Sequence, residues 1–584
     1  MADEHDASPQ LTRRALLRGA AVAGGLAATA GVAAAATTAT TPGARTRRRP
    51  RRPTKPNILV IVVDQMRYPQ WLAAGVAGAA FPPNIQRLRD GGVLFARHYA
   101  ASNDCSPARS TMLTGLYTHQ TWTLITGGST LDPGFPTWGG MLREHGYHTR
   151  WLGKWHLTHG DRHWNHATGE RALERYGFAG GIFPSPNGSP GQGYHRDPVI
   201  VDAFRRWLRE DGAGGPWCTT LSFVNPHDIA WWYALSGRVK AEASSPRVAA
   251  GLPPNFQTPA DLARQGKPRL QRSLQQTAAV SFGGVPFEGP DTAAYWRGML
   301  DLYVALQRMV DEHVGAALDA LEERPEIAAN TVVVFTADHG EYAASHGLRG
   351  KGAGVYEEGI RVPLIVKDPR GLLTRRPELV RRRLTSSVDL APLLLTIAAG
   401  SDAWRREAHY AHLAGRADLA RMLADPAAPG RSFVLHATDE IVTEFALEPY
   451  AADAPLHVQM IRTERAKYAT YSNWIAGTTI ATNAGREEEL YDYRHDDGRL
   501  ETENSAARSA LTEELGARLA DAAERELRAP LPESLRPAQR RGLANYLDVA
   551  QRDALVAAEH RRALIDHALG DRALLRPPPV GVPR

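Results

Sequence analysis

The sequence contains very few cysteines. Cys105 and Cys218 are the only two in 584 residues, which excludes a small fold held together by several disulfides. One bridge between them is possible in principle. We instead expect Cys218 to be a small buried apolar residue, because it lies beside the apolar run Leu221–Val224.

The chain also lacks a long run of large apolar residues. Gly19–Ala30 consists mainly of alanine and glycine, whereas membrane insertion favours Leu, Ile and Phe, so a membrane anchor is not favoured. Arg13 and Arg14 precede this stretch and Ala33–Ala35 follows it. This pattern predicts that residues 1–36 are a twin-arginine signal peptide, recognised by the Tat translocon, and that the protein is exported to the periplasm, cell surface or medium.

Excess charge of one sign is confined to one segment. The net charge is +6, but residues 43–56 alone carry +7 and residues 1–42 sum to zero, which leaves −1 for the rest. A nearly neutral body gives no indication of a nucleic-acid partner. Residues 37–56 are rich in Arg and Pro and are predicted to form a disordered linker.

Apolar strands alternate with helices through most of the remaining chain, and no internal repeat is visible. Asn57–Val63 is a β-branched run typical of a strand buried on both faces, and Thr331–Ala337 repeats this pattern. Further strands are expected at His148–Leu152, Trp217–Val224 and Val362–Val366. Helices are expected at Pro83–Asp90, from Cys105 through Leu113, and at Thr137–His145, Val199–Glu210, Thr292–Glu323, Val388–Ile397 and Ala506–Arg528. Together they predict an α/β fold with a large, mostly parallel sheet flanked by helices.

The pattern changes after residue 400. Short strands around Phe433–Leu435, His457–Arg462 and Lys467–Tyr471 predict a small antiparallel sheet. Residues 536–570 have a helical pattern and could pack on the body or mediate oligomerisation, whereas residues 234–290 show no clear periodicity. We therefore divide the chain into a main domain, 57–400, a C-terminal subdomain, 401–530, and a helical extension, 531–584.

Reactive residue types gather at predicted strand and helix ends. Asp64 and Asp338 each follow an apolar strand, where open α/β sheets place ligand sites. One such Asp could simply cap a helix, but two of them fit a site for a hard cation better. Cys105 precedes Pro107, which suits the first turn of a helix. The positive helix N-terminus would favour an anionic ligand or nucleophile at Cys105.

The motif from Cys105 to Gly115, Cys-x-Pro-x-Arg followed four residues later by Thr-Gly, resembles the signature of the sulfatase family. Two further blocks, Gly146–His156 and Ala337–Ile365, strengthen the resemblance, which extends over Pro56–Glu501. It implies an alkaline-phosphatase-like α/β sandwich, with residues 57–400 as the catalytic domain and a smaller C-terminal domain built on a short antiparallel sheet. In this family a formylglycine-generating enzyme oxidises the cysteine, and the hydrated aldehyde is the nucleophile.

The resemblance also implies roles for individual residues. One divalent cation would be bound by Asp64, Gln65, Cys105, Asp338 and His339. Catalytic roles would fall to Cys105, Arg109, Lys154, His156, His227 and Lys351. Asp-Gln and Asp-His, in place of the common Asp-Asp and Asp-Asn pairs, resemble the branch with choline sulfatases and phosphonate monoester hydrolases. Calcium is the metal expected from the family, and the imidazole makes manganese plausible.

The implied reaction is hydrolysis of a sulfate monoester of a small molecule or glycan to an alcohol or phenol and sulfate. One hydroxyl of the hydrate attacks sulfur, His227 or Lys351 protonates the alcohol, and His156 takes the second hydroxyl proton as sulfate leaves. The alternatives are a phosphonate monoester or phosphodiester hydrolase with the same site, and a non-catalytic binding protein on this scaffold. The aromatic run Trp231–Tyr233 belongs either to the core or to a pocket for an aryl or quaternary ammonium group.

Overall fold

A seven-stranded sheet forms the centre of the computed structural model, which describes residues 55–69, 81–231, 251–282, 284–443, 446, 449–475 and 478–550. In spatial order its strands are β2 (Val93–Leu94), β9 (Leu364–Lys367), β7 (Thr331–Ala337), β1 (Asn57–Asp64), β6 (Trp217–Pro226), β4 (His148–Gly153) and β5 (Ala179–Gly180). The strands from β7 to β5 are parallel, whereas β9 and β2 pair antiparallel at one edge. The predicted α/β class and mostly parallel sheet are confirmed.

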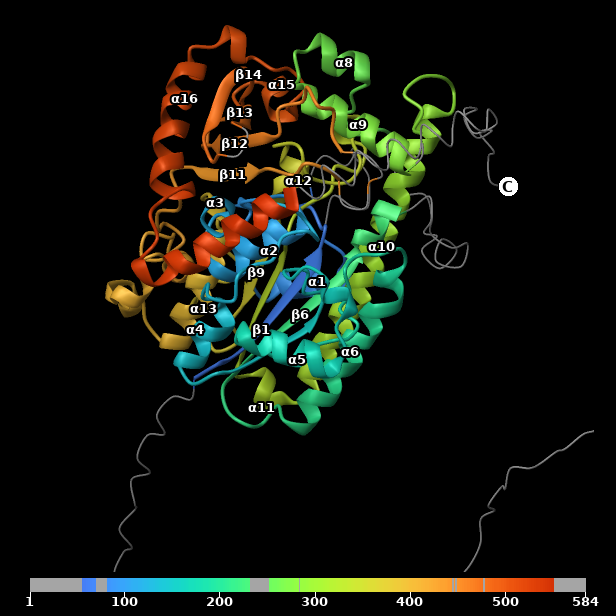
Figure 1. The fold of residues 1–584 in the computed structure, drawn as a ribbon. Coiled ribbons are helices and arrows are strands. Elements are labelled where there is room, and N and C mark those ends of the chain that lie inside the picture. Colours follow the sequence, from blue (N-terminus) through green and yellow to red (C-terminus); the bar gives the residue numbers. More distant parts are fainter. Residues whose placement is uncertain are drawn as a thin grey trace, which may run out of the picture. The chain divides into compact units, whose positions relative to one another are not determined.

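Helices cover both faces of this sheet (Figure 1). All of β1 is buried, and successive side chains point to opposite faces, so Val60 and Ile61 belong to different apolar clusters. The Val60 face packs on α2 (Cys105–Thr114), α4 (Trp138–Glu144) and α13 (Leu390–Ala399). The Ile61 face packs on α1 (Pro83–Asp90), α6 (Gln192–Glu210) and α10 (Thr292–Glu322). Fully buried strands between two helix layers explain the continuous apolar runs in the sequence.

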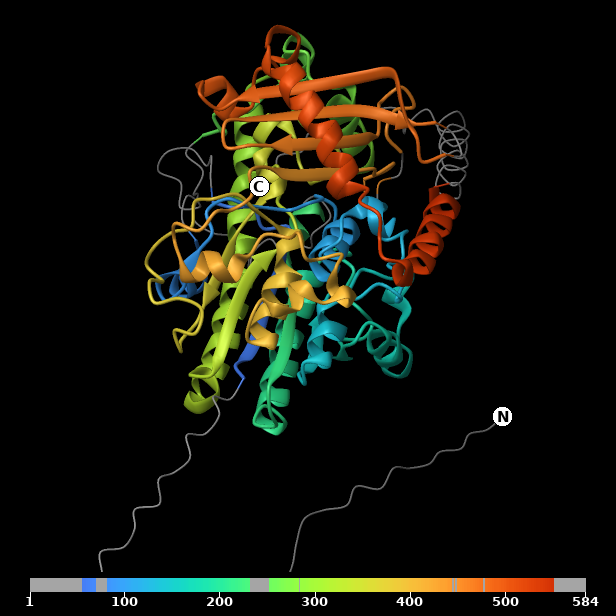
Figure 2. The same ribbon diagram turned by 90° about the vertical axis from the view of Figure 1, so that its left-hand side faces the viewer.

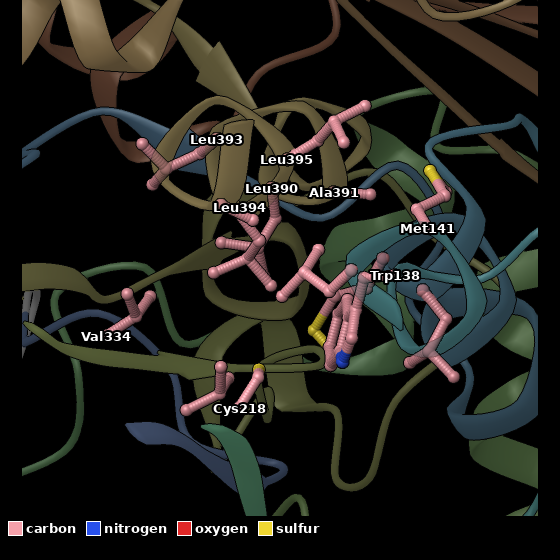
Figure 3. Close-up of a cluster of buried hydrophobic side chains, with 14 of the residues drawn as sticks. Trp138, Met141, Cys218, Val334, Leu390, Ala391, Leu393, Leu394 and Leu395 are labelled. Carbon is pink, nitrogen blue, oxygen red and sulfur yellow. The ribbon is translucent and has the colours of Figure 1, made fainter. Parts of the chain in front are cut away.

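Cys218 is a buried residue of β6, as predicted. It is fully inaccessible to solvent, and both cysteines are free thiols. Figure 3 shows Cys218 in the same apolar cluster as Trp138, Val334 and Leu390. Burial raises the pKa of its thiol strongly, so Cys218 is unreactive packing and leaves Cys105 as the chemically interesting cysteine.

A four-stranded antiparallel sheet forms the second layer of structure, beyond one end of the central sheet in both views (Figures 1 and 2). Its strands are β11 (Val434–Thr438), β12 (His457–Arg462), β13 (Ala466–Trp474) and β14 (Ala481–Asp492), and α16 (Leu511–Ala522) packs on it. A small sheet of β10 (Thr385–Ser386), β3 (His98–Tyr99) and β8 (Arg361–Val362) also forms. Further α-helices among the described residues include α3 (Thr118–Thr121), α5 (His166–Arg175), α8 (Pro259–Arg264), α9 (Arg269–Phe282), α11 (Pro325–Ala328), α12 (Glu357–Ile360), α14 (Leu419–Ala424) and α15 (Asp496–Leu500).

Several predicted elements need correction. The expected strand Val362–Val366 is two strands in different sheets, because Pro363 between β8 and β9 has no N–H to donate to a ladder. The helix expected from Val199 begins at Gln192 and contains Pro198. Strand β14 was not predicted, because its exposed and charged first half lacks an apolar pattern.

Other elements were predicted with shifted boundaries or not assigned. The helix expected at Val388–Ile397 is α13, and it begins after a short 3-10 turn at Ser387–Asp389. The helix expected at Ala506–Arg528 is largely α16, continued by one π-turn. Within residues 251–290, α8 and α9 occupy sequence to which we assigned no structure. Residues 536–550 are helical, as expected for that part of 536–570.

The predicted signal peptide and nearly all of the Arg/Pro-rich linker lie outside the described residues, as does the chain beyond residue 550. The domain boundaries at residues 400 and 530 stay predictions. Within the described parts of the chain, no helix has both the length and the apolar character needed to span a membrane.

Candidate active site

Cys105 is the first residue of α2, as its motif predicts. Asp104 precedes it in an extended conformation, and the helix ends at Gly115, whose positive φ of 70° closes the last turn. Every residue of α2 is buried. The Cys105 side chain therefore lies at the positive end of a helix inside the protein, where a negative charge is stabilised.

Strand pairing brings the two predicted aspartates together. Val63 of β1 pairs with Ala337 of β7 in parallel register, so the residues that follow them, Asp64 and Asp338, lie side by side. The backbone N–H of Gln65 donates to Oδ1 of Asp338 at 3.1 Å. The carboxyl ends of two adjacent strands thus build one edge of the site.

Four other groups surround the Cys105 sulfur. Nζ of Lys351 lies 2.6 Å and Nζ of Lys154 3.4 Å from Sγ. Nε2 of His339 lies at 3.2 Å and Oδ1 of Asp64 at 3.6 Å. Five predicted site residues from distant parts of the sequence therefore meet at one atom.

Arg109 bridges the two carboxylates. Its Nη2 lies 2.9 Å from Oδ2 of Asp64, and its Nε lies 2.9 Å from Oδ2 of Asp338. Its Nη1 donates to the backbone oxygen of Lys154 at 2.8 Å and to Oγ of Ser222 at 2.9 Å. The guanidinium fork, four residues after Cys105, therefore fixes the helix start against both strand ends.

The charges of the site are mutually compensated. Burial by itself would raise the pKa of Asp64, but Lys154, His227 and Arg109 hold it well below its usual range. Burial likewise opposes the charge of Arg109, but Asp338 and Asp64 raise its pKa. The site therefore holds an ionised Asp64 and a charged Arg109 in an environment where little water screens them.

The donor set suits a divalent cation. One ligand atom each from Asp64, Cys105, Asp338 and His339 lie within 4.8 Å of one another, and all four residues are buried. Nδ1 of His339 lies 2.9 Å from the backbone oxygen of Gly340, which can only accept, so the proton is on Nδ1 and the lone pair of Nε2 faces the site. Burial lowers the pKa of His339, which favours this neutral, ligating form.

Gln65 is held in part by Tyr303 and Glu341, to which we assigned no role. Its φ is +66°, and OH of Tyr303 donates to its backbone oxygen at 2.8 Å. Its side-chain Nε2 donates to Glu341, and its Oε1 accepts from Nζ of Lys351 at 3.1 Å. Glu341 lies two residues after His339 within the Ala337–Ile365 block, and this position was the one sequence signal for a role in the site. Its contact with Gln65 could not be inferred from spacing.

The two remaining predicted histidines, His156 and His227, are both buried. The backbone N–H of His156 donates to Oδ2 of Asp161, and the His156 ring faces Gly127. The backbone N–H of Gly127 donates to Oγ of Ser106, the residue after Cys105. His227 follows the end of β6, and its ring packs on Gly188. The catalytic roles of both histidines stay predictions.

A cavity adjoins the predicted catalytic groups. Gln65, His227, Trp231, Arg349 and Lys351 are among its lining residues. Nε1 of Trp231 donates to the backbone oxygen of Gly188, so the indole is fixed. The rest of the predicted aromatic run lies outside the described residues, so only its first member is placed at a pocket.

Comparisons with known proteins agree with this geometry. Residues 56–401 match the sulfatase family model. The chain is 27% identical over 379 residues to a choline-sulfatase of Rhizobium meliloti (strain 1021), covering 59% of this chain and 67% of the relative. It is 30% identical over 346 residues to the uncharacterized sulfatase YidJ of Escherichia coli (strain K12), covering 54% of this chain and 62% of that relative's length.

Solved structures show the same fold. The 2-O GAG sulfatase BT1596 superposes with a TM-score of 0.59 at 22% identity, covering 83% of this chain and 96% of that one. A phosphonate monoester hydrolase from Silicibacter pomeroyi also gives 0.59, at 20% identity, covering 82% and 96%. The resemblance inferred from the motifs is thus confirmed. Because the family model matches more than half of the chain, the protein belongs to the sulfatase family.

Proposed function

We propose that this protein hydrolyses a sulfate monoester to an alcohol or phenol and inorganic sulfate, with formylglycine formed from Cys105 as the nucleophile. The observation that carries the proposal is the meeting of Lys154, Lys351, Asp64 and His339 at the Cys105 sulfur. A sulfate monoester is an anion, and two ammonium groups and a helix N-terminus at the reacting atom offset its charge.

Two added groups complete the proposed site. A divalent cation, calcium or manganese, would be held by Asp64, Asp338 and His339, with Gln65 and residue 105 as further donors, and would supply positive charge for the ester oxygens. The formylglycine hydrate would supply a hydroxyl nucleophile and a second hydroxyl whose deprotonation releases sulfate.

The protein's own side chains then orient the ester and move protons. Lys154 and Lys351 hold the anionic group against residue 105, and Arg109 keeps the helix start and both carboxylates in place. His227 and Lys351 line the adjoining cavity, so either group can protonate a leaving alcohol held there. His156, on the Ser106 side, is the candidate base for the second hydroxyl.

Peptide mass spectrometry across Asp104–Arg109, on protein from the native host, tests the proposal together with hydrolysis of p-nitrophenyl sulfate. The expected result is an aldehyde or its hydrate at residue 105, and activity that is lost in Cys105→Ala. A thiol in all molecules, still inactive after co-expression with a formylglycine-generating enzyme, would favour a non-catalytic binding protein instead.

A phosphonate monoester or phosphodiester hydrolase is the second candidate. It is favoured by Gln65 and His339, which resemble the branch that includes phosphonate monoester hydrolases, and by the fold shared with such a hydrolase from Silicibacter pomeroyi. Rates on p-nitrophenyl sulfate and p-nitrophenyl phenylphosphonate, measured side by side on one preparation, distinguish the two activities. A higher kcat/KM for the phosphonate would overturn the sulfatase assignment.

Names of relatives indicate the range of substrates to screen. One relative is named N-acetylglucosamine-6-O-sulfatase, and one solved structure contains D-glucosamine-2-N,6-O-disulfate as its substrate. We propose a small-molecule or glycan sulfate as the substrate here, and export through a twin-arginine signal. Screening should therefore include choline sulfate, aryl sulfates and sulfated glucosamines.

A further inference from the structure

The chain as translated carries sulfur, not an aldehyde, at position 105. That sulfur completes a set of one thiol, one imidazole and two carboxylates, contributed by Cys105, His339, Asp64 and Asp338. Their side chains are fully or almost fully inaccessible to solvent. Sulfur and nitrogen together with few oxygens are the donors that zinc prefers, whereas calcium takes six to eight oxygens.

The distances between these donor atoms can be compared with a zinc site. Sγ lies 3.2 Å from Nε2 of His339 and 3.6 Å from Oδ1 of Asp64. Nε2 of His339 lies 3.6 Å from Oδ1 of Asp64 and 3.8 Å from Oδ1 of Asp338. Ordinary zinc–ligand bond lengths in a tetrahedron give edges of about 3.3 to 3.6 Å. These four of the six donor–donor distances therefore lie within a few tenths of an ångström of the edges of a zinc tetrahedron, and the other two are below 4.8 Å.

We propose that the unmatured protein, with Cys105 still a thiol, is a zinc-binding protein, and that conversion of Cys105 to formylglycine changes the metal preference of the same site. Binding of zinc forms a bond from Sγ to the metal and releases the thiol proton to solvent. Conversion replaces the only soft donor by oxygen. The site then holds only oxygen donors and one imidazole, which suits calcium or manganese.

The tautomer of His339 and the charges around Cys105 support this assignment. Because Nδ1 donates to Gly340, Nε2 offers its lone pair toward the sulfur without rearrangement. Lys351 at 2.6 Å, Lys154 at 3.4 Å and the start of α2 all stabilise a negatively charged sulfur. The second half of the proposal, the change on maturation, rests on the proposed function. The first half does not.

Cobalt is the probe for the experiment, because it substitutes for zinc and gives an intense near-ultraviolet charge-transfer band only when a thiolate is bound. Full-length protein is produced without a formylglycine-generating enzyme, and the thiol at residue 105 is verified by mass spectrometry. Titration with Co²⁺ should produce the band, and competition with Zn²⁺ should remove it. Zinc affinity should be at least about tenfold higher than in Cys105→Ser, since only the soft ligand differs.

Cys218→Ala is the matched control, because Cys218 is the other buried thiol and lies in the apolar core. Its band should equal that of the wild type, whereas Cys105→Ser and Cys105→Ala should show none. Far-ultraviolet circular dichroism identifies any variant that fails to fold, and the second Cys105 variant then replaces it. Absence of the band in the wild type, or equal zinc affinities of the wild type and Cys105→Ser, would overturn the proposal.

Protein matured by co-expression with a formylglycine-generating enzyme completes the comparison. Its zinc affinity should drop by at least about tenfold, and calcium or manganese should now be retained through gel filtration. Retention of zinc at unchanged affinity would refute the change of preference. Hydrolysis of p-nitrophenyl sulfate is measured on the same samples, so a protein that binds zinc as a thiol but hydrolyses nothing after maturation would contradict only the proposed function.

Discussion

Glu341 determines which end of the Gln65 side-chain amide faces the active site. The amide Nε2 of Gln65 donates to Oε2 of Glu341. Oε1 of Glu341 accepts the backbone N–H groups of Ala343 and Gly350, so this carboxylate presents only acceptors. The amide oxygen of Gln65 must therefore point the other way, where it accepts from Lys351. Glu341, two positions after the predicted metal ligand His339, thus orients a second predicted ligand, Gln65.

Replacing Glu341 by Gln should weaken metal binding. The new amide can keep the two backbone contacts with its oxygen, but its nitrogen then faces Gln65 and makes that side chain turn its oxygen away from the site. Loss of such an orienting contact costs roughly 10- to 100-fold in metal affinity. Isothermal titration calorimetry with Ca²⁺ and Mn²⁺, on protein stripped of metal by a chelator, measures the change in metal affinity.

Glu358→Gln is the matched control for this prediction. Glu358 is another buried carboxylate close in sequence, but it accepts from Asn255 and lies near His346 rather than Gln65. Its metal affinity should stay at the wild-type value. Equal affinities in both variants and in the wild type would show that Glu341 does not orient a ligand.

Arg109 should stabilise the fold as well as the site. It is buried and pairs with Asp64 and Asp338, so Arg109→Met removes one partner from each of two buried carboxylates, although Asp64 keeps its ion pair with Lys154 at 2.7 Å. Removal of one member of such a pair costs about 3–5 kcal/mol, which should appear as a fall in Tm by differential scanning fluorimetry. Arg541→Met, which removes an exposed partner of Asp132, should leave Tm nearly unchanged. Similar falls in both variants would argue against a special role for Arg109.

The sequence predicted the residues of the site better than the contacts between them. Asp64 and Asp338 could be found because each ends an apolar strand, and parallel strands bring their carboxyl ends to one edge. Cys105 and Arg109 followed from a motif with fixed spacing. These features depend on local pattern, which the sequence displays directly.

Contacts between distant segments could not be predicted in the same way. Glu341 meets Gln65 across 276 positions, and no periodicity links them. Pro363 divides a predicted strand into β8 and β9. Tertiary structure determines which strands these two pair with, and they pair in different sheets. The charged strand β14 forms because β13 offers it a pairing edge, not because of its own composition.

Two buried histidines should destabilise the fold in mildly acidic solution. Burial lowers the pKa of His346 and of His436 to about 4, compared with about 6.5 in an unfolded chain. Between about pH 6.5 and pH 4 the unfolded chain therefore binds protons that the folded protein does not, so stability is full above this window and decreases as pH falls through it. The contribution of these two histidines to Tm should fall across this range, whereas Asp161 and Asp228, whose pKa values burial raises to about 6, act in the opposite direction.

Removing one buried histidine should make this dependence shallower. Nδ1 of His436 donates to the backbone oxygen of Ala100, and Asn at this position can still donate there. His436→Asn should therefore reduce the slope of Tm against pH, whereas exposed His163→Asn should leave it unchanged. A slope that is identical in the wild type and both variants would assign the acid sensitivity to other groups.

Asp439 should hold the four-stranded sheet on the main body. It accepts from Nε2 of His119 in α3 at 2.7 Å, from Nδ1 of His457 in β12 at 2.6 Å and from Nε1 of Trp474 in β13 at 2.8 Å. The His119 contact crosses from the main body to the sheet. The neighbouring Thr438 donates to Asp104, which directly precedes Cys105. Loss of Asp439 would thus loosen an interface close to the nucleophile.

Asp439→Ala should leave three buried donors without an acceptor, and each unsatisfied group costs about 1–3 kcal/mol. We expect a lower Tm and faster amide hydrogen exchange in α3 and β12, with little change in α10 on the far side of the central sheet. Glu464→Ala, which removes a surface ion pair between Arg383 and Glu464 in the connection from β12 to β13, is the control and should match the wild type. Unchanged exchange in α3, even with a lower Tm, would mean that Asp439 stabilises its own sheet without tying it to the body that carries Cys105.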